Sequence, residues 1–590
     1  MKTEIKSRSS TPDSQDDKSV EAIVTSEPTS TDGIRDTIES VIVAFILAFV
    51  FRAFIVEAFV IPTGSMAPSL YGQHGQHRCD NCRYPISYGI REPIGTVAGT
   101  LRERDGRLRT FDVCCPNCSW QSGGNANINR DRDNRVVPNS GDRILVLKWP
   151  YDIGGDWLGP KRWDVVVFKD PKDGEQNFIK RLLGLPGEVL ELINGDLYTA
   201  PIESVPEDIQ EALSRPPPTN PNEPRLTQEQ ERKLAGLLKI QRKTSVAQSS
   251  LWMLHYDHDY VPRERRGRSH KAFNPPYWEG RTGPDKKAWD ASTPVVRFKP
   301  EEDDRLRWLS LKGRPIQDDY GYNNVSSIQG NRQTECYVGD VRLKFTLFPG
   351  HGEGEVILAL SKGTDEFRVR LASDGKVALE KLDRSAKNGV WVELKNRKVT
   401  PWQQGDALDL EFENLDYRLA LRINHEEIIW TDDIHYAPDI LKLLKQPYED
   451  GRNSNAGIKI GAKGAPIEIR HLQIHRDVFY RSVRLGTGGS IDFNRCPGWG
   501  TATNPILLRN DPPDYYCCGD NSPQSQDSRL WVEVCPMLQA RQRPNHYQFG
   551  TVPGDQLIGK AFFVYWPSGL RFSKETPAVI PNVGRMRMIR

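Results

Sequence analysis

Three short stretches of this 590-residue sequence hold the side chains best suited to chemistry. The first, Phe59–Leu70, carries Ser65 between a glycine and a methionine. The second, Phe178–Glu188, holds Lys180 within an apolar run, and the third, 519–529, begins Gly-Asp-Asn. A serine hydroxyl becomes a good nucleophile only when a base removes its proton. No histidine lies in any of the three stretches.

Lysine is the base that these stretches offer. The pKa of a lysine amine is about 10.4, and burial among apolar groups can lower it by as much as ~3–5 units. Residues 178–183 are expected to form a strand, on which alternation turns Phe178, Lys180 and Leu182 to one face. Such neighbours favour a neutral amine, whereas a strand lysine that faces water would stay charged. The strand pattern alone leaves both interpretations open.

An apolar segment precedes Ser65 and could anchor it. Val41–Phe51 is unbroken by polar residues, and from Ile38 through Val56 the segment reaches the roughly 20 residues that a bilayer span needs. We expect a disordered tail over 1–36 and one transmembrane helix over 37–58. A buried core helix and a cleavable signal segment are the alternatives, and the long acidic tail disfavours the second.

Two Cys-x-x-Cys pairs follow, formed by Cys79 with Cys82 and by Cys115 with Cys118. Each tight turn can present two thiolates to one ion, and four thiolates suit tetrahedral zinc. We expect a structural zinc in a ribbon-like module over 72–135, and no cofactor for catalysis. Two disulfides are the alternative, which an oxidising compartment would favour.

Composition and strand patterns predict a mainly β chain. Hydrophobic residues make up 37% of it, and its 48 glycines and 42 prolines favour loop-rich β domains over helical bundles. The net charge of +2 gives no electrostatic case for binding nucleic acid. Period-2 alternation predicts an antiparallel sandwich over 291–482, similar to concanavalin-like or laminin-G-like jelly rolls. We expect it either to bind a glycan or protein ligand or to be purely structural.

Together the three stretches resemble the conserved boxes of the type I signal peptidases, membrane-bound serine proteases that use a Ser/Lys dyad. The resemblance implies a catalytic core of the signal-peptidase β-fold, interrupted by inserts. The implied segments are a first core part at 59–71 and 136–200, a linker with a helical segment at 201–290, a second core part at 483–575, and a basic tail at 576–590.

The resemblance also assigns roles to single residues. Ser65 matches the nucleophile and Lys180 the general base. The oxyanion hole corresponds to the Ser65 backbone N–H with the Thr63 hydroxyl, and Ser525 matches a serine that orients the lysine ammonium. The residues that match the walls of shallow pockets for small side chains, the Ala-x-Ala preference, are Phe59, Ile61, Pro62, Met66, Leu70, Phe178 and Ile179.

Two supporting ion pairs are implied, Asp527 with Arg529 and Asp520 with Arg181. The third stretch departs from the family's common pattern, because Ser522-Pro523-Gln524 stands where Arg-Asp-Asn is usual. The matched serine, aspartate and arginine are nevertheless present, so we expect activity.

The implied function is that of a serine endopeptidase that removes signal peptides from exported preproteins. The resemblance places it in the cell (inner or cytoplasmic) membrane as a single-pass protein with an extracytoplasmic catalytic domain. Its implied partners are preproteins and the lipid bilayer. Two alternatives are a membrane-tethered binding protein built on a degenerate protease core and a self-cleaving repressor protease. The intact serine and lysine argue against the first, and the anchor argues against the second.

Overall fold

The structure is a computed structural model. It describes residues 30–89, 113–122, 139–215, 225–264, 276–280, 285–302, 305–318, 320–323, 336–383, 389–445, 456–481, 498–501, 504–541, 547–569 and 580–589. The chain divides into two compact units, Met1–Ile55 and Val56–Arg590.

The described part of the first unit is a helix. Helix α1 covers Ser30–Val50 and continues as a π-helical turn over Phe51–Ile55. Residues Arg35–Ile55 have a mean hydropathy of 2.3, so by length and composition this helix could cross a membrane. It begins within the predicted tail, whose residues 1–29 lie outside the described part. It also ends earlier than residue 58, because Val56 already pairs with a strand of the second unit.

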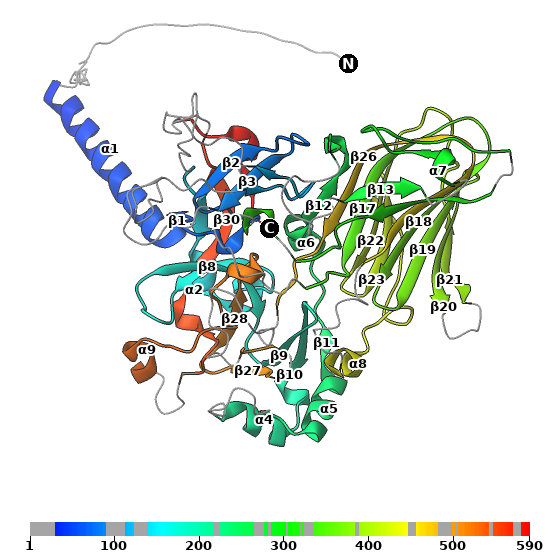
Figure 1. Ribbon diagram of the computed structural model, residues 1–590. Coiled ribbons are helices and arrows are strands. Elements are labelled where there is room, and N and C mark those ends of the chain that lie inside the picture. The colour runs from blue at the N-terminus through cyan, green and yellow to red at the C-terminus, as the bar shows by residue number, and fades with distance from the viewer. Residues whose placement is uncertain are drawn as a thin grey trace, which may run out of the picture. The chain divides into compact units, whose positions relative to one another are not determined.

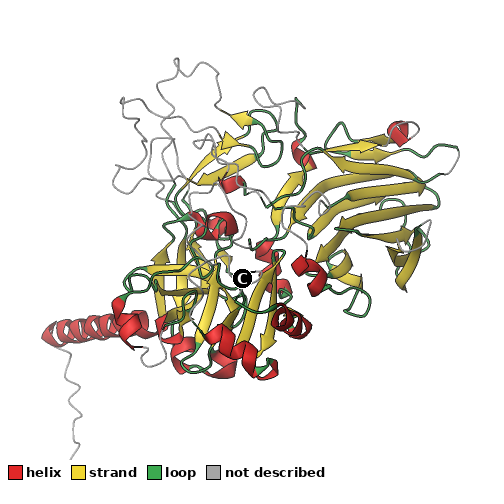
Figure 2. Ribbon diagram, turned by 60° about the horizontal axis from the view of Figure 1, so that its bottom comes forward, coloured by secondary structure: helices red, strands yellow, loops and turns green. Residues whose placement is uncertain are grey.

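An antiparallel sheet carries the Ser65 and Lys180 stretches, and strands predominate over helices in the second unit (Figure 2). Its order is β1 (Val56–Val60), β6 (Arg143–Leu147), β30 (Leu557–Trp566), β7 (Val165–Lys169), β8 (Asn177–Gly184), β28 (Asp514–Cys518) and β29 (Val552–Pro553). Strand β30, from the C-terminal part, lies between strands from the N-terminal part (Figure 1).

A four-stranded sheet extends the core. Its order is β11 (Lys239–Ile240), β10 (Asp196–Pro201), β9 (Glu188–Ile193) and β27 (Ile506–Leu508). Asn194 and Gly195 form the hairpin turn between β9 and β10, and their φ angles of 51° and 90° suit that pair of residue types. The helices beside it are α4 (Glu207–Ser214), α5 (Gln228–Leu237), α6 (Ser245–Leu251) and α8 (Ile440–Lys445). The short helices elsewhere in the described part of this unit are α2 (Trp149–Ile153), α3 (Gly155–Leu158), α7 (Asp285–Ala288) and α9 (Pro536–Arg541).

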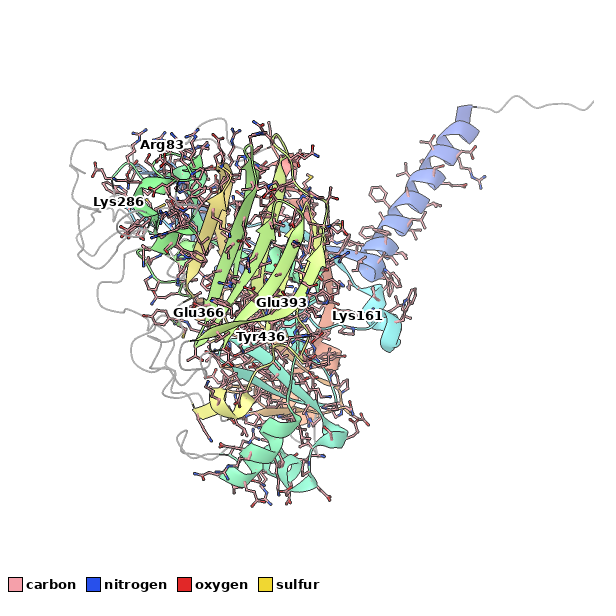
Figure 3. All side chains as sticks on the ribbon, turned by 90° about the vertical axis from the view of Figure 1, so that its right-hand side faces the viewer. Arg83, Lys161, Lys286, Glu366, Glu393 and Tyr436 are labelled. Atoms are coloured by element: carbon pink, nitrogen blue, oxygen red, sulfur yellow. The ribbon has the colours of Figure 1, made fainter. Side chains whose placement is uncertain are left out.

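Two antiparallel sheets form the predicted sandwich, which Figure 3 shows with Glu366, Glu393 and Tyr436 labelled. One is β14 (Trp289–Asp290), β15 (Val296–Phe298), β26 (Ile467–Arg476), β17 (Val341–Pro349), β22 (Leu408–Leu415), β23 (Arg418–Ile423) and β24 (Glu426–Trp430), with β12 (Met253–Asp257) on β26. The other is β13 (Tyr277–Gly280), β16 (Arg307–Lys312), β25 (Ile458–Gly464), β18 (Gly354–Lys362), β19 (Asp365–Ala372), β20 (Lys376–Asp383) and β21 (Val390–Lys398). One continuous apolar core lies between them.

Three predictions about segments of the chain are wrong. The sandwich begins near residue 253 rather than 291, because β12 and β13 belong to its sheets. The helical segment expected within 201–290 is not one helix, since Thr227 and Thr244 each cap a separate helix with their side chains. The C-terminal segment is not a solvated tail: β31 (Arg587–Met588) pairs with β30.

The cysteine-rich segment forms two small hairpins. Strands β2 (His74–Arg78) and β3 (Pro85–Gly89) make the first, and β4 (Val113–Cys114) and β5 (Gln121–Ser122) make the second. Each hairpin carries one Cys-x-x-Cys pair in its turn.

Buried ion pairs join the sandwich to the core. The Lys243 amine, which precedes α6, lies 2.6 Å from an Asp416 oxygen and 2.7 Å from an Asp477 oxygen. The Lys362 amine lies 2.7 Å from an Asp340 oxygen and 3.4 Å from an oxygen of Asp196, at the β9–β10 turn. Because buried charges need partners, these contacts constrain how the sandwich docks.

We expect Lys243→Ala to lower the free energy of unfolding by about 3–5 kcal/mol, because it leaves two carboxylates buried without a cation. Lys395→Ala is the matched control: its partner, Asp432, is at the surface, and we expect no measurable change. Denaturant unfolding of both variants measures the difference. Equal stability of the two variants would contradict this account of the junction.

Candidate active site

The structure brings Ser65 and Lys180 together across 115 positions of sequence. Ser65 lies in a single 3-10 turn, Gly64–Met66, shortly after β1, and Lys180 lies in β8. The Lys180 Nζ atom is 2.9 Å from the Ser65 Oγ atom. A serine hydroxyl and a lysine amine therefore lie within hydrogen-bonding distance of each other.

Lys180 is almost completely buried, with 4% of its surface exposed. Burial disfavours the ammonium and lowers the pKa of Lys180, although the Asp527 carboxylate opposes part of the shift. The Nζ atom also contacts the Ile179 carbonyl oxygen at 3.1 Å and lies 5.0 Å from the centre of the Phe178 ring. The site thus favours a neutral amine at a pH where an exposed lysine is charged.

Asn521 holds the Ser65 turn in place. Its backbone N–H donates to the Ser65 carbonyl oxygen at 2.9 Å, and its side-chain amide donates to the Gly64 carbonyl oxygen at 2.9 Å. Gly519 permits this approach, because a Cβ there would lie 2.5 Å from the Ser65 carbonyl oxygen. Asn521 was not among the predicted site residues; its place in the Gly-Asp-Asn motif was the one sequence signal for it.

Two fully buried ion pairs accompany the contact, and both form as predicted. Arg181 donates to the two Asp520 oxygens, each at 2.8 Å, and Arg529 donates to the two Asp527 oxygens at 2.8 and 2.7 Å. Although burial favours a protonated carboxyl, the Arg529 guanidinium holds the pKa of Asp527 below its usual value. These ionised groups are therefore paired with one another rather than with the Lys180 amine.

The roles predicted for Ser525 and Thr63 stay predictions. Ser525 is fully buried beside the Asp527 carboxylate, but its Oγ atom makes no regular hydrogen bond and hence none to Lys180. Thr63 is exposed at the start of the Ser65 turn, and its hydroxyl does not cap that turn.

The seven predicted pocket residues divide by burial. Those buried together in one hydrophobic cluster are Ile61, Met66, Leu70 and Ile179. Those with exposed surface are Phe59, Pro62 and Phe178. The second group therefore presents more surface to a substrate than the first.

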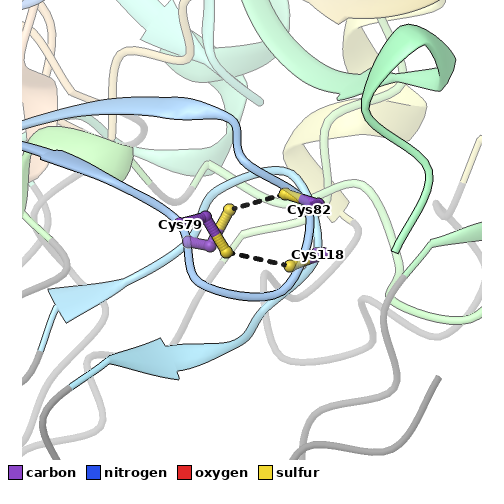
Figure 4. A group of neighbouring side chains, drawn as sticks. Cys79, Cys82 and Cys118 are labelled. Atoms are coloured by element: carbon purple, nitrogen blue, oxygen red, sulfur yellow. Dashed lines mark hydrogen bonds between the residues drawn. The ribbon is translucent and has the colours of Figure 1, made fainter. Parts of the chain in front are cut away.

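The four predicted zinc ligands come together. Figure 4 labels three of them, Cys79, Cys82 and Cys118, whose sulfurs lie on the inner side of the cluster. The Cys79 and Cys118 sulfurs are 3.5 Å apart, and the Cys82 and Cys115 sulfurs are 3.7 Å apart. In tetrahedral zinc sites, Zn–S distances of about 2.3 Å place the ligand sulfurs roughly 3.8 Å apart. The four cysteines are unpaired as disulfides, and their spacing fits zinc.

Each cysteine turn is also docked on the segment that follows β12. Asn81 exchanges two hydrogen bonds with the Glu264 backbone, at 2.8 and 2.9 Å. Asn117 donates to the Tyr260 carbonyl oxygen at 3.0 Å and accepts from the Asp257 N–H at 2.7 Å. The cysteine module therefore contacts the sandwich insert through the asparagine that precedes the second cysteine of each Cys-x-x-Cys pair.

Comparison with known proteins finds relatives for part of the chain. Residues 136–260 match the family model described as signal peptidase, peptidase S26. Signal peptidase I of Buchnera aphidicola is 38% identical over 79 residues, which cover 12% of this chain and 24% of that protein. Signal peptidase I of Pseudomonas fluorescens is 39% identical over 80 residues, covering 12% and 27%. The matched segment thus spans about a quarter of these relatives' length.

Two solved structures resemble part of the chain. The carbohydrate-binding module CBM66 from Bacillus subtilis matches with a TM-score of 0.22 and 11% identity, over 33% of this chain and 94% of that one. Sheep galectin-11 matches with a TM-score of 0.17 and 14% identity, over 25% and 99%. At these TM-scores neither likeness supports a conclusion about function.

The buried amine gives a prediction about pH. The pKa of Lys180 is lower in the native protein than the ~10.4 of an unfolded chain, so unfolding takes up a proton between the two values. This destabilises the native state at lower pH and ceases to matter as the pH approaches ~10.4. We therefore expect Lys180→Met to gain thermal stability relative to wild type at neutral pH, and the gain to shrink towards ~10.4.

Melting temperatures of the two proteins between about pH 6 and about pH 10 measure this effect. Ser65→Ala is the control, because it keeps the lysine and should keep the pH dependence of the wild type. A difference between wild type and Lys180→Met that does not vary with pH would refute the assignment of a lowered pKa.

Proposed function

We propose that this chain is a membrane-anchored serine endopeptidase that removes N-terminal signal peptides from exported preproteins. The observation that carries the proposal is the 2.9 Å contact between the Ser65 hydroxyl and the buried Lys180 amine. The match of residues 136–260 to the S26 signal peptidases supports the same assignment, because this segment contains the lysine strand.

In the proposed mechanism, neutral Lys180 accepts the Ser65 proton as Oγ attacks the scissile carbonyl carbon. The Ser65 N–H and the Thr63 hydroxyl stabilise the resulting oxyanion. Collapse of this intermediate breaks the peptide bond, and the Lys180 ammonium gives its proton to the leaving amine. A water, deprotonated by Lys180, then attacks the Ser65 ester, which releases the signal peptide and restores the hydroxyl.

The position of Ser65 suits a substrate at the membrane. Ser65 follows the end of the hydrophobic helix, Ile55, by ten positions, so the proposed nucleophile is tethered near the bilayer. We place the helix in the cell membrane as a single span, with the catalytic unit on the extracytoplasmic side. The pocket residues with exposed surface, together with the family resemblance, support cleavage after small residues of the Ala-x-Ala type.

A structural zinc at Cys79, Cys82, Cys115 and Cys118 completes the proposal. When bound, zinc would crosslink the two hairpins and contribute folding energy, and no step of the hydrolysis needs it. A glycan or protein ligand for the sandwich stays a prediction, and so does the absence of a nucleic-acid partner.

The proposed dyad predicts the outcome of a cleavage assay. With a preprotein that carries alanine at the −1 and −3 positions, we expect wild type to release the signal peptide. Ser65→Ala and Lys180→Met should each lose at least ~10³-fold in kcat, because nucleophile and base act as one unit. Gel analysis with N-terminal sequencing of the product measures this, and equal processing by all three proteins would rule the dyad out.

The cysteine geometry predicts metal content. We expect about one zinc per purified chain, lost in Cys115→Ser together with thermal stability. Cys114→Ser is the matched control, because Cys114 lies next to the cluster in sequence but outside it, and we expect this variant to retain zinc. Elemental analysis measures the metal. Metal-free protein whose four cysteines are oxidised would show two disulfides instead.

A further inference from the structure

A segment of the sandwich insert packs on the Ser65 turn. Tyr322, which lies between β16 and β17, is 8% exposed and donates from its hydroxyl to the Gln73 carbonyl oxygen at 2.9 Å. Its ring occupies the space beside Gly64, where a Cβ would lie 2.1 Å from the ring. The residue before the proposed nucleophile is therefore in direct contact with the insert.

The next residue, Asn323, pairs with Asn521. The Asn323 side-chain nitrogen donates to the Asn521 side-chain oxygen at 2.7 Å, and the Asn521 nitrogen donates back at 2.9 Å. The same Asn521 nitrogen donates its second hydrogen to the Gly64 carbonyl oxygen. Asn521 is fully buried, and all of its side-chain donors and its oxygen are thereby engaged.

The hydrogen bonds agree on which end of the Asn521 amide faces Gly64. The Gly64 carbonyl oxygen, which also accepts from the Ala67 N–H at 3.0 Å, can only accept, so the Asn521 nitrogen faces it. The Asn323 amide then satisfies the second Asn521 hydrogen and the Asn521 oxygen, and so holds the Asn521 amide against Gly64.

The consequence reaches the proposed oxyanion hole. The Gly64 carbonyl and the Ser65 N–H belong to one planar trans peptide, so they point in opposite directions. Holding the Gly64 oxygen therefore orients the Ser65 N–H, the donor that the proposed mechanism directs at the oxyanion.

The segment that carries Asn323 is itself held firmly. Arg481 donates to both oxygens of Asp318, which is fully buried, and the Arg481 N–H donates to the Ser522 Oγ atom at 2.9 Å. The Arg476 guanidinium lies 4.5 Å from the centre of the Tyr320 ring. Asn323 therefore follows a segment that Arg481 links to Ser522, the residue next to Asn521.

We propose that Asn323, supplied by the insert, is a positioning residue for hydrolysis: through Asn521 it orients the Ser65 N–H that binds the oxyanion. The inference rests on the proposed function and adds to it that the insert completes the catalytic centre. It acts on the transition state and leaves the binding of the substrate's ground state largely unchanged.

The test compares full-length wild type, Asn323→Ala, Asn323→Asp and Asn323→Gln with the preprotein substrate. Removing a whole oxyanion donor typically costs ~10²–10³-fold in kcat, so misorienting one should cost about 10-fold. We expect this loss, with KM within about twofold, for the alanine and aspartate variants. Aspartate keeps the size but offers no donor to the Asn521 oxygen, whereas glutamine offers both groups and should recover most of the activity. Asn396→Ala, at an exposed site on β21, should match wild type.

A second readout separates positioning from a loss of structure. A peptide boronate with alanine at its first and third positions forms a tetrahedral adduct on a nucleophilic serine. Its affinity for Asn323→Ala should fall by the same factor as kcat. Unchanged kcat, or a fall in kcat with unchanged boronate affinity, would overturn the inference about Asn323. The proposed dyad would still stand in that case, provided that Ser65→Ala is inactive and wild type is active. Absence of cleavage by wild type would overturn the proposed function, and this inference with it.

Discussion

The account depends on one desolvated contact, the amine of Lys180 against the hydroxyl of Ser65. In water a lysine amine is protonated at neutral pH and cannot accept a proton. In a protein interior an unpaired ammonium is costly, so burial favours the neutral amine. Placing Lys180 on β8, between β7 and β28, removes water from the amine. The neighbouring carboxylates are occupied by arginines, so they oppose the lowered pKa of Lys180 only in part.

The inserts are joined to this contact by polar interactions rather than by linkers alone. Lys243 and Lys362 bridge the sandwich to the core through buried carboxylates. Asn81 and Asn117 dock the cysteine turns on the segment after β12. Asn323 then reaches the Ser65 turn itself. The large insert and the catalytic part accordingly belong to one compact unit, Val56–Arg590.

Sequence reasoning was most successful where a residue type has few physical uses. Serine and lysine in matched stretches, paired Cys-x-x-Cys turns and strands of period two all form as expected. It failed where tertiary contacts decide. Nothing local marks Asn323 as a partner of a residue 198 positions away. The Ser525 Oγ atom makes no hydrogen bond to Lys180, and the basic C-terminal segment pairs with β30 beyond the residues of β30 that pair with β7.

The pH profile of kcat/KM with a preprotein substrate tests the central claim most directly, because it reports the essential groups of the free enzyme. The account predicts a rising limb governed by deprotonation of Lys180, with an apparent pKa well below the ~10.4 of an exposed lysine. Activity that rises only near ~10.4 would contradict it, since the lysine would then be charged at neutral pH and unable to act as the base.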